Sequence, residues 1–106
     1  MRVVLHPEAR KELRSAALWY DERRAGLGTE FVAEVSAMLE RVANSPHAFS
    51  WWPGIASPRS IRRAVLRRFP YLIAIEKQHG RVVVLAIGHG KRRPLYWLAR
   101  ANPEKP

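Results

Sequence analysis

The sequence contains no cysteine in its 106 residues. Without cysteine there is no disulfide framework and no thiolate nucleophile, and structural zinc lacks its commonest ligand. The four histidines are scattered and have no closely spaced acidic partners, which excludes the usual metal-binding patterns. We therefore predict no metal site and no cofactor, and we expect a reducing, cytoplasmic environment.

Long apolar runs are also missing. The first run, Val3 to Leu5, stops at His6 and Pro7, well short of the apolar region of a signal peptide. No later stretch approaches the roughly 20 apolar residues that a membrane-spanning helix needs. We expect a protein that is neither exported nor anchored in a membrane.

Acidic residues are scarce in the second half of the chain. Residues 1–58 carry seven Lys or Arg and seven Asp or Glu, whereas residues 59–106 carry twelve and two. The formal net charge of +10 therefore belongs to the later segment. Charge gathered in this way is typical of a basic protein that meets an anionic partner, either nucleic acid or an acidic protein.

The composition is that of one folded domain. Apolar residues make up 47% and charged residues 26% of the chain, which is typical of a globular protein rather than a disordered one. A chain of this length holds one compact core and is short for two. We predict a single domain over residues 1–101 and a flexible tail over residues 102–106.

The first half predicts a strand and two helices. A short β-branched run from Arg2 to Leu5 precedes Pro7, which suits the first turn of a helix. Apolar residues then recur at three- and four-residue spacing from Pro7 to about Ala25, and again from Phe31 to Asn44. Because the glycine-containing link between them is short, the helices should pack antiparallel as a hairpin.

The second half predicts an antiparallel sheet. Strand-like runs cover residues 60–68, 71–77 and 81–89, and a three-residue link ending in glycine joins the last two. In the middle run, Tyr71, Ile73 and Ile75 share one face while Ala74 and Glu76 take the other. The first run has no clean alternation, so the faces of its arginines stay open. The predicted fold class is α/β (α+β), with the helical hairpin packed on a small, mostly antiparallel sheet.

Residues 46–58 form a proline-rich loop that contains Trp51 and Trp52. Its length is one at which loops tend to be functional or to carry structure of their own. The two tryptophans either cap one end of the core or anchor a binding partner. We favour the core and keep the partner as the alternative.

Four blocks of the sequence resemble the RelE/ParE toxins of bacterial type II toxin–antitoxin modules. They read HPEARKELRSAALWY, GLGTEF, IRRAVLRRFPYLIAIE and VVVLAIGHGKRRPLYWLAR, and together they run nearly from end to end. The resemblance implies a toxin that a cognate antitoxin holds inactive and that arrests growth when released, as in plasmid stabilisation. It also implies one of two targets, because ParE-like members block DNA gyrase whereas RelE-like members cut mRNA on the ribosome.

If the chain is a nuclease, the resemblance and the residue types suggest a tentative catalytic set. Metal-independent RNA cleavage needs a base, an acid and cations that stabilise charge on the phosphate. Arginines could supply the charge, a histidine and a tyrosine could exchange protons, and a glutamate could act as base. The candidates are Arg62, Arg67, Glu76, His89, Arg92 and Tyr96.

Each candidate also has an ordinary explanation. His89 could bond backbone at a strand end, and Tyr96 with Trp97 could pack the tail onto the sheet. Residues 59–68 contain five arginines, which is an unusually high positive charge for one strand, so we expect these arginines to face the target or the antitoxin. The predicted partner-binding residues are Arg59, Arg62, Arg63, Arg67, Arg68 and Arg93, with Trp51 and Trp52.

Between the two mechanisms we favour the ParE-like one and lean against an enzyme. The long helical hairpin, the GLG link and the HGKRRPLYW ending are similar to ParE-like chains, and lysine is scarce in the sheet, where RelE-like nucleases carry several. A further alternative is a basic nucleic-acid-binding module, although the chain has no recognition-helix motif and no RNP aromatic pair. We assign His6, His47 and His79 no chemistry.

Overall fold

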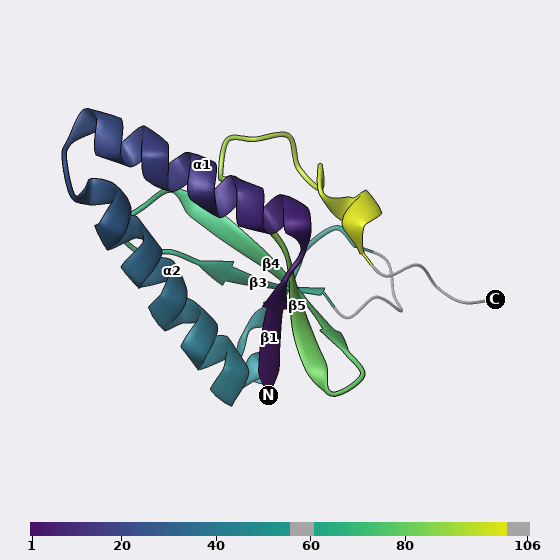
Figure 1. Ribbon diagram of the computed structural model, residues 1–106. Helices are drawn as coiled ribbons and strands as arrows, with labels where there is room; N and C mark the ends of the chain where they lie inside the picture. The colour runs from purple at the N-terminus through teal and green to yellow at the C-terminus, as the bar shows by residue number, and fades with distance from the viewer. Residues whose placement is uncertain (56–60, 102–106) are drawn as a thin grey trace.

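The computed structural model describes residues 1–55 and 61–101, and every structural statement below refers to that part of the chain. Both helices stand on one side of a single sheet, and the C-terminal segment lies near the N-terminal half of α1 (Figure 1). The elements in chain order are β1 (Arg2–Leu5), α1 (Pro7–Arg23), α2 (Leu27–Asn44), the 3₁₀ turn η1 (Pro46–Ala48), β2 (Ser50–Trp51), β3 (Ile61–Val65), β4 (Tyr71–Gln78), β5 (Arg81–His89) and the 3₁₀ turn η2 (Leu98–Arg100). The predicted α+β architecture is confirmed.

The helical hairpin closes over a very short link. Gly26 has φ of 90°, a left-handed conformation that glycine adopts without a steric penalty. A Cβ at Gly28 would overlap the Ala17 carbonyl oxygen, and the Gly28 N–H donates to Asp21 Oδ1 at 2.7 Å. This close approach explains why the first turn of α2 needs glycine at position 28. The first helix ends at Arg23, two residues earlier than expected, because Gly26 has to reverse the chain.

The sheet has the strand order β1-β5-β4-β3-β2. All neighbouring strands pair antiparallel except β1, which pairs parallel with β5 from Arg2↔Arg81 to Leu5↔Val84. Pro7 begins α1 and so stops β1 at Leu5. Within residues 1–55 and 61–101, the part of β5 beyond Val84 therefore has no strand partner on that side. The functional site described below lies at this open edge.

The two faces of the sheet carry two separate apolar clusters. The face under the helices holds an aromatic group in which Tyr20, Phe31, Phe69 and Tyr71 contact one another, with ring centroids 4.8 to 6.1 Å apart. As predicted, Tyr71, Ile73 and Ile75 belong to this cluster, and Ala74 belongs to the cluster on the other face. That second cluster is closed by Trp97, which the C-terminal segment supplies.

The strand predicted over residues 60–68 is β3, and its observed extent is Ile61–Val65. Its residues alternate between the sheet faces, with Ala64 under the helices and Ile61 on the opposite side. Arg62 lies with Ile75 and Val82 on the helix side, whereas Arg63 lies with Trp52 and Leu72 on the other. The structure thus separates two neighbouring arginines that the sequence pattern left unassigned.

Candidate functional site

Two loops meet at one end of the sheet. The β3–β4 loop (66–70) and the arm, which we define as residues 90–101 after β5, are tied by a hydrogen bond from Gly90 N–H to the Pro70 carbonyl at 2.8 Å. Because Tyr71 pairs with His89, the start of β4 and the end of β5 lie side by side there. Cationic side chains of both loops are thereby gathered at one end, which we call the basic end.

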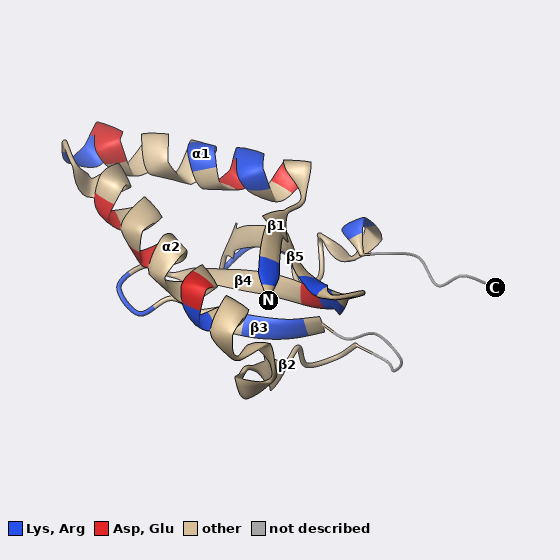
Figure 2. Cartoon of the chain, turned by 60° about the horizontal axis from the view of Figure 1, so that its bottom comes forward, with Lys and Arg blue, Asp and Glu red and all other residues tan. Residues whose placement is uncertain are grey.

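Glutamates of α2 hold the β3–β4 loop in place. Glu34 Oε2 accepts the backbone N–H groups of Arg67 at 2.7 Å and Arg68 at 3.2 Å. The Arg68 side chain donates to Glu30 Oε1 at 2.7 Å, and this hydrogen bond lowers the pKa of Glu30. Arg68, which we predicted to face a partner, is therefore paired within the chain, whereas the Arg67 side chain is exposed. Figure 2 shows that acidic segments lie along both helices and that basic segments lie in β3 and in the loop that follows it.

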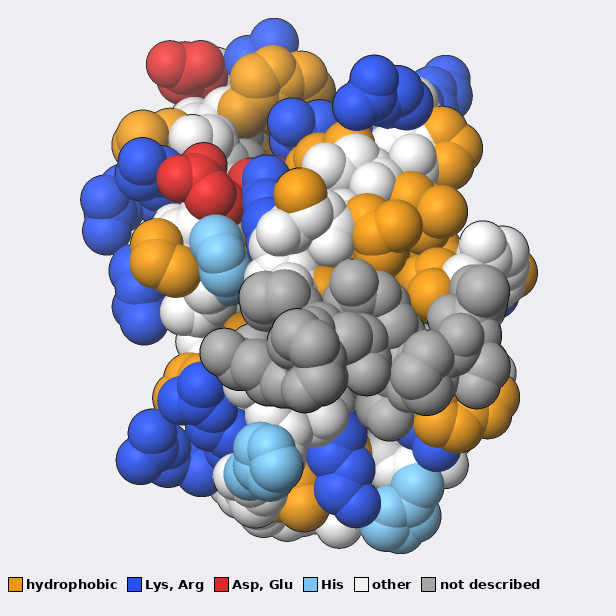
Figure 3. Space-filling view, turned by 90° about the vertical axis from the view of Figure 1, so that its right-hand side faces the viewer, with side chains coloured by type: hydrophobic (Ala, Val, Ile, Leu, Met, Phe, Trp, Pro, Cys, Tyr) orange, Lys and Arg blue, Asp and Glu red, His pale blue; other side chains and the backbone are white. Residues whose placement is uncertain are grey.

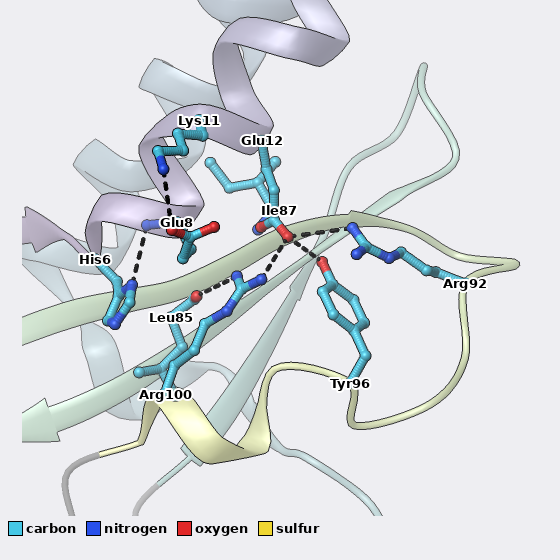
Figure 4. A network of polar contacts seen from close by, with 9 residues as sticks. All are labelled: His6, Glu8, Lys11, Glu12, Leu85, Ile87, Arg92, Tyr96 and Arg100. Atoms are coloured by element: carbon cyan, nitrogen blue, oxygen red, sulfur yellow. Dashed lines mark hydrogen bonds and ion pairs between the residues drawn. The ribbon is translucent and has the colours of Figure 1, made fainter.

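One carboxylate on α1 holds the arm. Glu12 is largely buried, with 13% of its side chain exposed, and it accepts four hydrogen bonds (Figure 4). Its Oε1 accepts the Ile87 backbone N–H at 2.9 Å. Its Oε2 accepts the Tyr96 hydroxyl at 2.8 Å, Arg100 at 3.0 Å and Arg92 at 3.3 Å. A single side chain thus joins α1, β5 and three residues of the arm.

This network changes the expected chemistry of Tyr96. Burial, together with the hydrogen bond to Glu12, raises the pKa of Tyr96 to about 12. The Arg92 guanidinium stacks 3.7 Å above the Tyr96 ring and is itself paired with Glu12. A phenol with such a raised pKa is a poor proton carrier near neutral pH. Tyr96 and Arg92 therefore pack the arm onto the domain, the ordinary role considered for Tyr96 above.

His89 lies at the end of β5, as its position in the sequence predicts. Its Nδ1 accepts the Lys91 backbone N–H at 3.0 Å, and its ring packs edge-on against Tyr71 with centroids 5.4 Å apart. The histidine thus stabilises the turn that follows the strand. No carboxylate among the described residues makes a hydrogen bond or ion pair with it, so nothing there orients it as a general base.

Several cations at the basic end have no partner among the described residues. These are the side chains that we call the basic end surface: Arg63, Arg67, Lys91 and Arg93. Arg63 and Arg93 line one small cavity of about 200 Å³, and none of the described residues that line it is acidic. An anionic partner would meet unneutralised charge at the basic end. Another side of the molecule, seen from the right of Figure 1, also shows more Lys and Arg side chains than Asp and Glu ones (Figure 3).

A larger groove of about 680 Å³ runs between α1 and the ends of β4 and β5. Its walls mix acidic, basic and aromatic side chains, including Glu8, Lys11 and Trp19, and Trp19 is half exposed. The mixed charge makes it less selective for an anion than the basic end surface. Its floor includes Glu12 and Arg100, so the network of the arm is accessible from this groove.

The tentative catalytic residues do not come together. Glu76 is 6% exposed on β4 and faces away from the helices, and its register partners are Ile61 and Val83, far along the strands from the Tyr71–His89 pair. Glu76, the possible base, therefore does not lie beside His89, because Glu76 is five positions along an extended strand from Tyr71, which pairs with His89. Its carboxylate accepts Gln78 Nε2 at 3.0 Å.

Arg62 also lies away from the basic end. Its guanidinium donates to the Phe49 carbonyl at 2.6 Å and stacks 3.6 Å above Trp51. Trp51 on β2 is 57% exposed, so it does not cap the core as we favoured. Trp52 does, because its ring packs 4.8 Å from that of Trp97. Arg59 lies outside the described residues.

The sequence analysis missed Glu12 and Arg100. Glu12 falls three residues after Ala9 and four before Ala16, both of which are buried. A charged residue at that spacing on an apolar stripe is a signal that could have identified it as partly buried. Arg100 gave no such signal, because only the folded arm brings it to Glu12 and to the Leu85 carbonyl, 3.1 Å from Arg100 Nη1.

Among the described residues no group of three or more His, Asp or Glu could hold a metal ion. No described helix has the length and apolar character that crossing a membrane requires.

Comparison with known proteins agrees with the resemblance. The family described as the ParE toxin of type II toxin–antitoxin systems, parDE, matches residues 3–94. Among solved structures, a chain of the chromosomal ParDE toxin–antitoxin system from P. aeruginosa superposes with a TM-score of 0.72 at 13% identity, covering 84% of this chain and 95% of that chain. At that identity the likeness supports the fold alone. No curated protein sequence matches significantly.

Proposed function

The chain belongs to the family of ParE toxins of type II toxin–antitoxin systems, and we propose that it acts in the cytoplasm, arrests growth by inhibiting DNA gyrase, and is neutralised by a cognate antitoxin. A role in plasmid stabilisation is part of the same proposal. The observation that carries the choice of gyrase is the match of residues 3–94 to the ParE family.

The geometry of the site favours a binding toxin over a nuclease. Acid–base cleavage of RNA needs a proton acceptor and a proton donor on either side of one phosphate. Here Tyr96 is held with a pKa of about 12, Glu76 lies at another part of the sheet, and Arg92 is paired with Glu12. The side chains that do stand free, on the basic end surface, are suited to binding an anionic surface.

The proposal is tested with the purified toxin. We expect it to inhibit supercoiling by purified gyrase, to raise the DNA-damage response when expressed alone, and to lose both effects when the antitoxin is co-expressed. mRNA on ribosomes should stay intact. Cleavage of mRNA within the decoding site, with supercoiling unaffected, would instead establish the RelE-like mechanism.

Replacing His89 separates the two mechanisms further. A proton-transfer residue contributes roughly 10² to 10⁴ in rate, whereas a histidine that only accepts the Lys91 N–H contributes about 1 kcal/mol to stability. We expect His89→Ala to keep gyrase inhibition while unfolding at a slightly lower urea concentration. A variant that stays folded but loses ribosome-dependent cleavage would identify His89 as catalytic.

A further inference from the structure

The arm is attached to the rest of the domain through one ionised side chain. Three of the four hydrogen bonds that Glu12 accepts come from the arm, from Arg92, Tyr96 and Arg100. The fourth comes from Ile87 N–H on β5. Hydrogen bonds to a charged acceptor are stronger than neutral ones, and this acceptor is largely shielded from water. Removing the carboxylate would release all four donors at once.

These bonds close the open edge of β5. Because β1 ends at Leu5 opposite Val84, the backbone of β5 beyond Val84 has no strand partner on that side. Glu12 accepts from Ile87 N–H and Arg100 donates to the Leu85 carbonyl, so two side chains bond the edge where a strand would otherwise pair. The arm is thus docked onto backbone groups as well as onto α1.

Two local features show that the arm is held tightly in place. Leu95 has φ of 59°, a left-handed conformation that a bulky residue adopts only where its surroundings enforce it. Tyr96 packs so closely on β5 that a Cβ at Gly88 would overlap its hydroxyl oxygen. The arm therefore has one preferred position, and Glu12 lies at its centre.

We propose that Glu12 is the positioning residue of the basic end surface: by holding the arm against β5 and α1, it sets where the side chains of Lys91 and Arg93 stand relative to Arg63 and Arg67. This inference rests on the proposed function, because it names the residue that orders the surface by which the toxin meets its target. Glu12 itself makes no contact with that target.

The inference is tested by loosening the arm in two independent ways. Glu12→Ala and Glu12→Gln alter the acceptor, since a glutamine can accept from fewer of the four donors and carries no charge for Arg92 and Arg100. Gly88→Ala leaves Glu12 in place but displaces the Tyr96 hydroxyl. The matched control is Glu8→Gln, which removes a carboxylate one turn earlier on α1 that forms only a surface ion pair with Lys11 at 3.3 Å.

Two readouts are measured on every variant: amide hydrogen exchange and inhibition of gyrase supercoiling. We expect exchange at the amides of Ile87, Leu98 and Arg100 to become at least about 10-fold faster in Glu12→Ala, which corresponds to the loss of about one charge-assisted hydrogen bond. Inhibition per folded molecule should fall by about 10-fold or more, because interface arginines commonly contribute that much each. Gly88→Ala should shift both readouts in the same direction, Glu12→Gln should lie between, and Glu8→Gln should match the parent.

Three outcomes would overturn the inference. The first is an arm whose exchange in Glu12→Ala equals that of the control. The second is exchange that rises uniformly over the whole domain, which would make Glu12 an ordinary stabilising residue. The third is a loosened arm with unchanged inhibition. If the parent protein fails to inhibit gyrase, the proposed function fails, while the exchange measurements still decide whether Glu12 holds the arm.

Discussion

The two faces of the sheet use arginine in different ways. On the helix face, Arg62 donates to the Phe49 carbonyl, stacks on Trp51 and so holds residues 47–51 against the sheet. On the opposite face, the Arg63 side chain has no hydrogen bond or ion pair with the described residues, and the same is true of the Arg67 and Arg93 side chains at the basic end. Residues of one type that are close in the sequence thus hold a segment in place at one site and lack such a partner at the other.

The contrast is sharpest between Arg62 and Arg63, which are adjacent on one strand. Successive side chains of a strand point to opposite faces, so one residue reaches backbone carbonyls under the helix side and the other faces the cavity near the arm. A count of charges over residues 59–106 cannot separate the two. It follows that net charge identifies the half of the chain that carries the excess cations but not which of these cations are paired within the fold.

The largest effect is expected at the basic end. Replacing Arg63, Arg67 and Arg93 together by alanine should weaken gyrase inhibition by about 100-fold or more, since interface arginines often contribute over 1 kcal/mol each. The free energy of unfolding should stay within about 0.5 kcal/mol of the parent, because none of the three makes an ion pair within the described chain. Supercoiling assays and urea unfolding measure the two quantities.

A control variant tests whether the loss of inhibition depends on the position of the arginines or only on the net charge of the protein. Arg2, Arg10 and Arg14 are exposed on β1 and α1, and replacing them by alanine removes the same charge from another part of the molecule. We expect this control to keep most of the inhibition. Equal losses in the two triple variants would mean that net charge alone drives association and that the basic end surface is not the docking site.

A smaller effect is expected on the helix face of the sheet. Arg62→Ala should lower the free energy of unfolding by about 1–3 kcal/mol, because it leaves the Phe49 carbonyl without its charged donor. Arg63→Ala, the neighbouring control, should change it by less than about 0.5 kcal/mol. Inhibition by the folded Arg62 variant should match the parent. If the two variants unfold alike, the contrast between the two faces does not hold.

The smallest effect at neutral pH concerns the titration of Tyr96. Its pKa of about 12 in the folded protein lies above the ordinary value of 10.0, so the unfolded chain loses this proton first as pH rises. The associated stability is therefore present below about pH 10 and is lost towards about pH 12. In an absorbance titration of Glu12→Gln, the last tyrosine to ionise should do so at lower pH than in the parent, because the negative charge of Glu12, which opposes ionisation of Tyr96, is gone. An unchanged titration would place Tyr96 outside the Glu12 network.

Much of the fold could be predicted from local patterns. The periodicity of the two helices, the first strand and the hairpin of β4 and β5 each depend on residues close in sequence, and all were confirmed. The site could be predicted only in part: His89 was placed correctly at a strand end with a backbone partner, whereas the separation of Glu76 from His89 along the sheet and the exposure of Trp51 were not predicted. Their surroundings depend on register and on which strand ends meet, and neither follows from spacing.

The sequence by itself determined the secondary structure and the half of the chain that carries the excess charge, because helix and strand periods and net charge are properties of short windows. The tertiary structure alone decided which cations lack a partner among the described residues. Glu12 lies 75 residues before Ile87 and 88 before Arg100, and only the docking of the arm along the unpaired part of β5 brings them together. Glu12 is one of several acidic residues along α1, and it becomes the centre of the network that holds the arm only through long-range contacts. Local sequence patterns do not predict such contacts.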